Sequence, residues 1–260
     1  MKHKILVILV IVILGGLGFS NRSMAQMDKV LNLPTYDFSK YHFGFILAGN
    51  QMSFSLKTQE GFTDVWYYDS DAPGLSYDSL RILSITGEPT PGFTIGIVAN
   101  LRLGKYFDLR FIPSLAFGER KLNYSLFGYR DSVPSILEIP KPITSTYVEF
   151  PLHVKYKSER LNNMRAYVLA GVKYNLDLAS NKKNKEEDNE GNPVFLKLQK
   201  HDLLFEVGVG FDFYTAFFKF GTELKMGWGI NDLLEREDNI FTNGIDRLNS
   251  KIMTISLTFE

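Results

Sequence analysis

The sequence predicts an all-β protein, an eight-stranded antiparallel transmembrane β-barrel of the outer-membrane type. Three observations predict it: eight segments alternate apolar and polar residues, the connections between them are alternately short and long, and aromatic residues gather near the segment ends. Side chains of a strand alternate between two faces, so one face meets lipid and the other the lumen. Closure of the barrel then leaves no unpaired strand edge in the membrane.

The first 25 residues have the pattern of a cleaved secretory signal peptide. Lys2 and Lys4 precede an apolar run over residues 5–19, and the small residues Ser23 and Ala25 precede Gln26. A single membrane anchor is the alternative, but this run is shorter than the roughly 20 residues that a spanning helix needs. We therefore expect a signal peptide over 1–25, a periplasmic N-terminal segment over 26–40 and the barrel over 41–260.

Composition excludes some function classes. The chain carries 29 basic and 29 acidic residues, and loss of Lys2, Lys4 and Arg22 leaves 26 against 29, a net charge of −3. Such a chain has no basic footprint for nucleic acid. It has no cysteine, so disulfides do not stabilise it. No metal-ligand spacing or phosphate-binding glycine motif stands out, and we expect no cofactor.

Each predicted strand is long enough to cross the hydrocarbon region, which takes roughly 9 to 11 residues. In chain order the strands are 41–56, 90–103, 107–120, 144–157, 165–178, 202–214, 217–230 and 250–259. The alternation is clearest in the sixth strand, where Phe205, Val207 and Val209 share one face. Glu206 and Gly208 lie on the other face, whereas a helix would mix the two sets.

The connections between these strands are of two kinds. The short ones are 104–106, 158–164 and 215–216, and the long ones are 57–89, 121–143, 179–201 and 231–249. Outer-membrane barrels have short periplasmic turns and long extracellular loops, so we expect both termini in the periplasm.

Aromatic residues supply an independent indication, because membrane-interface girdles lie at strand ends. At the predicted periplasmic ends are Tyr41, Phe43, Phe107, Tyr156, Phe213, Phe218 and Phe259, and toward the other rim are Phe117, Tyr174 and Trp228. Phe259 also resembles a C-terminal aromatic assembly signal, although Glu260 follows it. The alternative architecture, a soluble β-sandwich, has less reason to keep charges on its inner face.

The lumen-facing positions predict a network of charges. They are Arg102, Asp108, Arg110, Glu149, His153, Lys155, Lys173, Asp177, Glu206, Asp212, Lys219, Glu223 and Lys225. A barrel of eight strands is only wide enough to be filled by its own side chains, so we expect these residues to pair across the interior. A proton or small-solute path is the functional alternative.

An enzyme at the rim is a further alternative. His201 with Asp202 and a loop serine would supply a base and a nucleophile for acyl or ester chemistry, but no spacing enforces that arrangement. We therefore predict no enzymatic activity.

The long loops differ in character. Residues 181–192 are highly charged and predict a solvated tip. The first loop contains Phe62, Val65, Trp66, Tyr67 and Tyr68, which fold over the barrel mouth or bind a partner. Residues 133–142 contain three prolines, which favour a stiff, extended loop.

The segment from Asn32 to Phe54, NLPTYDFSKYHFGFILAGNQMSF, resembles the start of the PorT family, called SprT in gliding bacteria. Asn32–Pro34, Tyr36, Asp37 and the KYHFGF run of residues 40–45 carry the resemblance, followed by Asn50, Met52 and Phe54. Looser matches follow over residues 94–120 and 146–160, in strings that also occur in other outer-membrane barrels of the Bacteroidetes.

The resemblance implies a non-enzymatic outer-membrane component of the type IX secretion system, which exports cargo proteins and supports gliding in some species. Its implied partners are other secretion-system proteins and the outer-membrane lipid. From the motif we predict a partner-contact patch of Tyr36, Asp37, Lys40, Tyr41 and His42, with anchoring of the N-terminus at the membrane interface as the alternative. A generic small barrel that acts as an adhesin or surface-binding protein is the other functional candidate.

Overall fold

The computed structural model describes residues 31–68, 75, 77–179, 196–237 and 239–260. The chain divides into two units, Met1–Leu31 and Asn32–Glu260, and the second unit is described below. The predicted signal peptide, residues 1–25, and the predicted charged tip, residues 181–192, lie outside the described residues. In the part of the chain that is described, no helix has the length and apolar character to cross a membrane.

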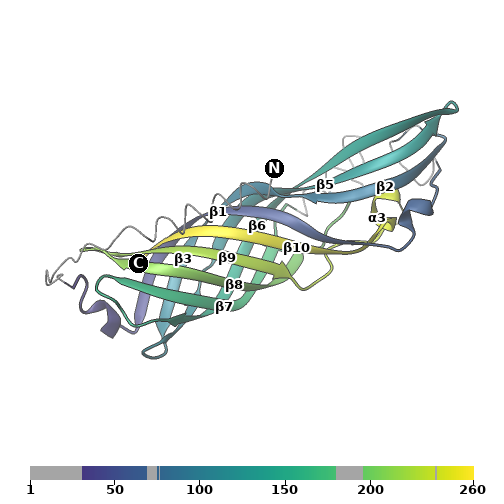
Figure 1. The fold of residues 1–260 in the computed structure, drawn as a ribbon. Helices are drawn as coiled ribbons and strands as arrows, with labels where there is room; N and C mark the ends of the chain where they lie inside the picture. The colour runs from purple at the N-terminus through teal and green to yellow at the C-terminus, as the bar shows by residue number, and fades with distance from the viewer. Residues whose placement is uncertain (1–30, 69–74, 76, 180–195, 238) are drawn as a thin grey trace. The chain divides into compact units, whose positions relative to one another are not determined.

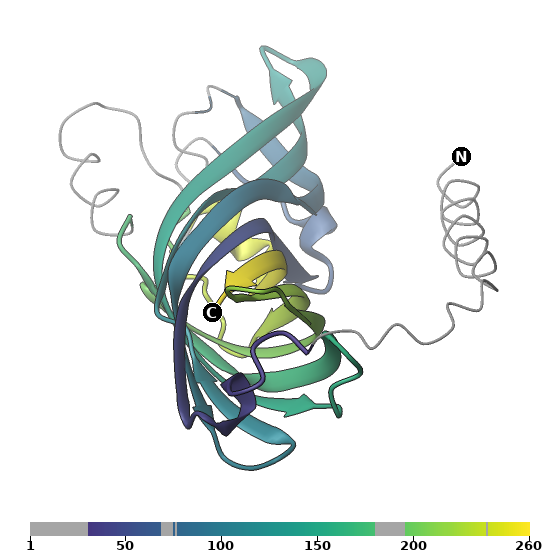
Figure 2. The ribbon, with the colours of Figure 1, turned by 90° about the vertical axis from the view of Figure 1, so that its left-hand side faces the viewer.

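The described residues of the second unit form one antiparallel ten-stranded sheet that closes on itself (Figures 1 and 2). The strands are β1 (Tyr41–Thr58), β2 (Ser79–Glu88), β3 (Thr90–Arg102), β4 (Phe107–Phe111), β5 (Ser114–Arg130), β6 (Val133–Lys157), β7 (Met164–Asp177), β8 (His201–Tyr214), β9 (Lys219–Gly229) and β10 (Ile245–Phe259). Three short helices accompany them: η1 (Tyr36–Phe38), η2 (Phe62–Asp64) and α3 (Ile240–Asn243). Closure follows because β1 pairs with β10 on one side and with β3 on the other.

Two of the wall strands are interrupted, which reconciles ten segments with the eight predicted strands. Pro89 separates β2 from β3, and Ile112 and Pro113 separate β4 from β5. The β2–β3 strand pairs with the β4–β5 strand along both halves. A proline has no N–H to donate to the ladder, so strands break or bulge at such positions. The predicted fold class and the eight-strand count are confirmed.

The wall has the predicted alternation of faces. On β8, Phe205 and Val209 are 45% and 53% exposed, whereas Glu206 and Asp212 are 2% and 1% exposed. Aromatic rings also stack on the outside, as Phe45 does on Phe259 with ring centroids 4.7 Å apart. The barrel therefore has an apolar exterior and a polar lumen, as a membrane barrel requires.

We call the rim that carries the β3–β4, β6–β7 and β8–β9 turns the short-turn end, and the opposite rim the long-loop end. At the long-loop end the structure differs from the prediction. Residues 57–89 and 121–143, predicted as loops, are in large part strand, since β2 occupies 79–88 and β5 and β6 form a hairpin around Asp131 and Ser132. The alternation simply continues outward: Leu122, Tyr124 and Leu126 are buried on one face.

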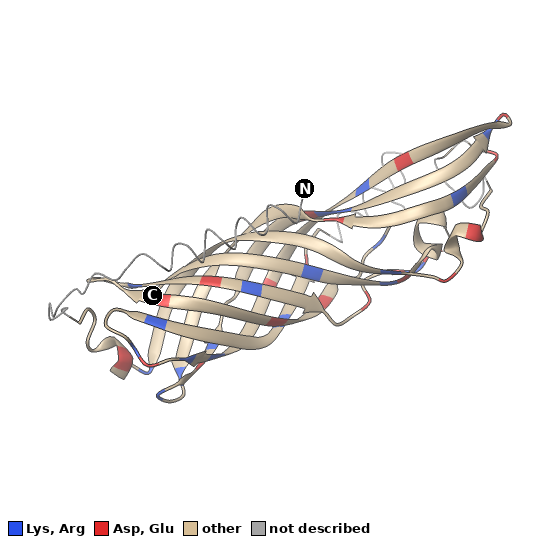
Figure 3. Cartoon of the chain, viewed as in Figure 1, with Lys and Arg blue, Asp and Glu red and all other residues tan. Residues whose placement is uncertain are grey.

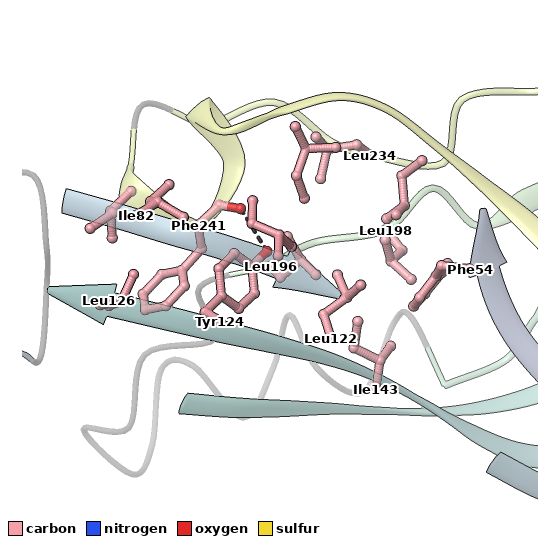
Figure 4. Packing of buried hydrophobic residues seen from close by; sticks show 14 of the residues in the cluster. Phe54, Ile82, Leu122, Tyr124, Leu126, Ile143, Leu196, Leu198, Leu234 and Phe241 are labelled. Atoms are coloured by element: carbon pink, nitrogen blue, oxygen red, sulfur yellow. Dashed lines mark hydrogen bonds between the residues drawn. The ribbon is translucent and has the colours of Figure 1, made fainter. Parts of the chain in front are cut away.

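We call the outer parts of β2, β5 and β6 the extension. Its buried face packs on a hydrophobic cluster that we call the cap (Figure 4). Three connections that lie far apart in sequence supply Tyr67, Leu196, Leu198, Leu233, Leu234, Ile240 and Phe241. The strands supply Phe54, Leu80, Ile82, Ile85, Leu122, Tyr124, Leu126, Ile143, Ile245 and Leu248. The Tyr124 hydroxyl donates a hydrogen bond to the Phe241 carbonyl oxygen at 2.8 Å. The cap closes the long-loop end.

The proline-rich tract is also strand rather than loop. Between Val133 and Ile143, β6 pairs with β5 on one side only, because its pairing with β7 begins at Tyr147. Pro134, Pro140 and Pro142 are separated by even numbers of residues, so they share one orientation in the strand. Proline is tolerated on such an edge, where no ladder donor is needed.

Candidate functional site

Charged residues of both signs are distributed along the wall strands of the barrel (Figure 3), and their side chains meet in the lumen. Near the short-turn end, Arg110 of β4 pairs with Glu223 of β9 and, at 3.1 Å, with Glu260. Glu260 also accepts from Lys219 at 2.9 Å. All four side chains are buried, and the Arg110–Glu223 pair joins β4 and β9, which are not neighbours in the sheet.

A second group lies farther along the lumen. The Lys173 ammonium lies 2.8 Å from a Glu206 carboxylate oxygen and 3.1 Å from one of Glu149. His153 Nε2 is 2.9 Å from the other Glu206 oxygen. Lys225 lies 3.4 Å from Glu223, which connects this region to the first group. Each buried charge thus has an opposite partner, as the low dielectric requires.

A third group of charged residues also lies in the lumen. Lys155 bonds to Asp212 at 2.8 Å and lies over the Tyr167 ring, 3.5 Å from its centroid. Lys157 bonds to Asp108 at 2.6 Å. These contacts occupy the lumen with side chains of β4, β6, β7 and β8, and such a lumen leaves no wide aqueous passage.

The structure buries every predicted lumen residue except Arg102. Arg102 lies at the last position of β3, where its Nε donates to the Gly104 carbonyl oxygen at 3.2 Å in the short turn. It is partly exposed, because the strand ends there and its side chain follows the turn rather than the lumen.

Some buried charges were missed by sequence reasoning, namely Arg120, Lys157, Arg165, Asp202 and Glu260. The alternation of side chains along the strands could have identified these residues. Lys157 lies two residues beyond Lys155, and Glu260 continues the lumen-facing series of Ser256 and Thr258. Glu260 is therefore a lumen residue. Its position after Phe259 had only made the C-terminal aromatic signal weaker.

Arg120 sits between the charge network and the cap. Its guanidinium donates to Ser250 Oγ at 2.9 Å, to Ser145 Oγ at 3.0 Å and to the Tyr147 hydroxyl, and it lies 4.4 Å from the centroid of the Phe54 ring. One face of this side chain thus meets polar lumen groups and the other meets a cap residue.

The short-turn end is closed by a segment that we call the plug, residues Asn32–Phe38. Its aromatic residue Tyr36 stacks on His42 with centroids 3.8 Å apart and donates from its hydroxyl to Glu260 at 3.1 Å. His42 Nε2 donates to the Tyr36 carbonyl oxygen at 2.9 Å. The plug is thereby joined to the lumen network through Glu260.

Basic residues of β7 and of the preceding turn hold the rest of the plug. Arg165 donates two hydrogen bonds to the Asp37 carboxylate, at 2.9 and 3.0 Å. Arg160 donates to the carbonyl oxygens of Asn32 and Leu33. Partial burial alone raises the pKa of Asp37, but the hydrogen bonds and charge of Arg165 outweigh it and keep that pKa below its ordinary value of 3.8.

The predicted partner-contact patch divides into two groups. Tyr36, Asp37 and His42 are turned toward the barrel and make the plug contacts described above. Lys40 and Tyr41 are exposed, and the Lys40 ammonium lies 5.9 Å from the centroid of the Tyr41 ring. The first group therefore contacts the barrel itself, and only the second group is free to contact a partner.

His201 and Asp202 do not come together as a base and its partner. His201 lies on the outside of β8, where its Nδ1 is 2.6 Å from the Tyr174 hydroxyl. Asp202 is buried on the lumen side, since consecutive strand residues point to opposite faces. In the described parts of the chain, no group of three or more His, Cys, Asp or Glu side chains is placed to hold a metal ion.

A closed barrel with an apolar exterior and a charged lumen defines an outer-membrane β-barrel, and the chain belongs to that family: the sequence model described as "Outer membrane protein beta-barrel domain" matches residues 74–235. Its location is the outer membrane.

Among solved structures, the outer membrane protein OprG from Pseudomonas aeruginosa is similar at 12% identity and a TM-score of 0.34, over 85% of this chain and 96% of that one. Neisserial surface protein A (NspA) is similar at 13% identity and a TM-score of 0.38, over 85% and 98%. No curated protein sequence matches the chain.

Substitution of one partner of a buried ion pair tests the network. We expect Arg110→Met to lower the free energy of unfolding by about 3–5 kcal/mol, because Glu223 and Glu260 lose a buried counter-charge. The matched control is Lys105→Met, which removes the exposed Lys105–Glu159 pair and leaves stability nearly unchanged. Urea unfolding of the detergent-solubilised barrel measures both, and equal effects would contradict the account.

Acidification tests how the plug is held. Because the pKa of Asp37 is lowered in the folded state, its contribution is fully present above 3.8 and is lost as pH falls through the lower folded value. The chain has no cysteine, so a nitroxide at Ser39→Cys is a unique label. We expect an immobilised spectrum from pH 8 down to pH 5 and a mobile one only in strong acid. With Asp37→Asn added, the label should be mobile throughout, and an unchanged spectrum would refute the role of this pair.

Proposed function

We propose that this protein is a non-enzymatic outer-membrane component of the type IX secretion system, with its short-turn end and both termini in the periplasm. One observation carries the proposal: the residues that resemble the PorT family are those that build the plug. Asn32, Tyr36, Asp37 and His42 make its contacts with the barrel. The motif therefore has a physical role that a generic small barrel does not require.

The filled lumen supports an accessory role rather than a conduit. Ion pairs such as Arg110–Glu223 cross the lumen, the plug covers one end and the cap covers the other. A folded cargo protein is far wider than the interior of an eight-stranded barrel. The protein thus acts through its surfaces, on cargo that passes elsewhere.

The lengths of the connections support the proposed orientation. Outer-membrane barrels keep their short turns in the periplasm, so in this proposal the plug lies there as well. The exposed residues at the end of the plug and just after it then become the contact surface for other secretion proteins. We narrow the predicted patch to Lys40 and Tyr41 and add Phe38, whose side chain is 82% exposed. Phe38 adds an aromatic ring beside Lys40 and Tyr41, and aromatic side chains are enriched at protein interfaces.

Deletion of the gene tests the proposal. We expect cargo proteins with C-terminal secretion signals to accumulate in the periplasm and to return to the medium when the intact gene is restored. Normal secretion in the deletion strain would contradict the proposal.

Complementation with variants then locates the contact. Phe38→Asp with Lys40→Glu should leave the barrel assembled but fail to restore secretion, because both side chains face solvent. Phe217→Asp is the matched control: Phe217 is 90% exposed in the β8–β9 turn, outside the proposed patch, and that variant should restore secretion.

A further inference from the structure

The β2–β5–β6 extension has an outer face opposite the cap. The short segment around Tyr67 adds to its edge, because Tyr67 and Leu80 exchange two backbone hydrogen bonds of 2.7 and 2.8 Å. Tyr67 points into the cap, so its neighbours Trp66 and Tyr68 point outward. The first-loop aromatic residues therefore divide into two groups, since Tyr67 packs in the cap whereas Trp66 and Tyr68 remain exposed.

On this outer face, aromatic rings surround one guanidinium. The Arg81 guanidinium lies 5.3 Å from the centroid of the Trp66 ring and 5.2 Å from that of Phe127. Tyr129 stacks beside Trp66 at 6.1 Å and meets Phe127 edge to face at 5.4 Å. Trp66 and Tyr129 remain 38% and 37% exposed. We call these residues the aromatic platform.

Arg81 has no carboxylate partner among the residues that the structure describes, and its Nε is buried without a hydrogen bond. Elsewhere in this chain the guanidinium groups of Arg110 and Arg165 pair with carboxylates. Two aromatic faces hold the Arg81 group in place while leaving its remaining N–H donors without an acid. Such a group recognises an anion, because guanidinium binds carboxylate with two parallel hydrogen bonds.

A polar hollow of about 390 Å³ adjoins the platform on the same outer face. Its lining includes hydroxyl, amide and carboxylate side chains of β2, β5 and β6, namely Ser84, Thr86, Asn123, Ser125 and Glu138. The two features are continuous, because Phe127 of the platform and Ser125 of the hollow are two residues apart on β5.

We propose that the platform and hollow bind an acidic saccharide. The apolar face of a sugar ring stacks on Trp66 and Tyr129, a carboxylate on the sugar accepts hydrogen bonds from Arg81, and neighbouring hydroxyls bond to side chains of the hollow. A cation without a carboxylate partner in the described part of the chain favours an anionic ligand, and the hydroxyl-lined hollow favours a ligand rich in polar groups. An apolar protein surface satisfies neither requirement.

In the proposed orientation this face lies outside the cell, where acidic saccharides come from two sources. One is the lipopolysaccharide of the same membrane, and the other is a free or foreign polysaccharide. Binding is measured on the purified full chain and does not depend on secretion. The test of the saccharide site is therefore independent of the test of the proposed secretion role.

Calorimetric titration of the detergent-solubilised protein tests this site with three probes: a galacturonate hexasaccharide, the neutral galactose hexasaccharide, and delipidated polysaccharide from the producing strain. We expect an acidic probe to bind at least tenfold more tightly than the neutral one. Preference for the strain's own polysaccharide identifies the first source, and preference for the hexagalacturonate the second. Equal binding of the neutral and acidic hexasaccharides, or no binding of any probe, would overturn the proposal.

Matched variants locate the binding. Arg81→Gln and Trp66→Ala should each weaken it at least tenfold, whereas Arg130→Gln, in the same hairpin, and Trp228→Ala, on the barrel wall, should not change it. The chain has two tryptophans, so in a Trp228→Phe background the fluorescence of Trp66 should respond to the ligand. Unchanged affinity in Arg81→Gln would refute the site, and circular dichroism verifies that each variant is folded.

Discussion

The whole structure depends on the pairing of charges inside a narrow barrel. A lumen side chain cannot reach bulk water, so a charge there is stabilised by an opposite partner or, as for Arg120, by several hydrogen bonds. Arg110 meets Glu223 and Glu260, and Lys173 meets Glu149 and Glu206, each pairing reaching between different strands. These pairs require that the strands keep their register, because a shift by one residue would move every charge to the lipid face.

Both ends of the barrel are closed by segments that build on this network. At the short-turn end, Glu260 takes part in the network and also accepts from Tyr36 of the plug. At the long-loop end, Arg120 bonds to lumen hydroxyls while its guanidinium lies over Phe54 of the cap. The closure leaves the outer surfaces for contact with partners, and our proposals place such contacts at Phe38 and Lys40 at one end and at the aromatic platform at the other.

Much of the barrel was predictable from the sequence because the alternation of side chains reports a local property of strands. The eight strands, their faces and the lumen position of residues such as Glu206 follow from it. The extension was missed because prolines at 134, 140 and 142 resemble a loop, and only the pairing shows that they lie on an edge. The plug and the aromatic platform could not be predicted, since Asp37 and Arg165 are 128 residues apart and Arg81 meets rings from two other segments. Such contacts depend on how the closed barrel brings distant segments together, and the alternation of side chains does not specify this.

Conductance across a planar bilayer tests most directly whether the lumen is filled by its own charge network. The account predicts no stable ion current for the full chain, and also none after Asp37→Asn loosens the plug, because the pairs around Arg110, Lys155 and Lys173 remain in place. A steady, open current in either protein would contradict the account, and it would mean that the lumen serves as a path rather than a packed core.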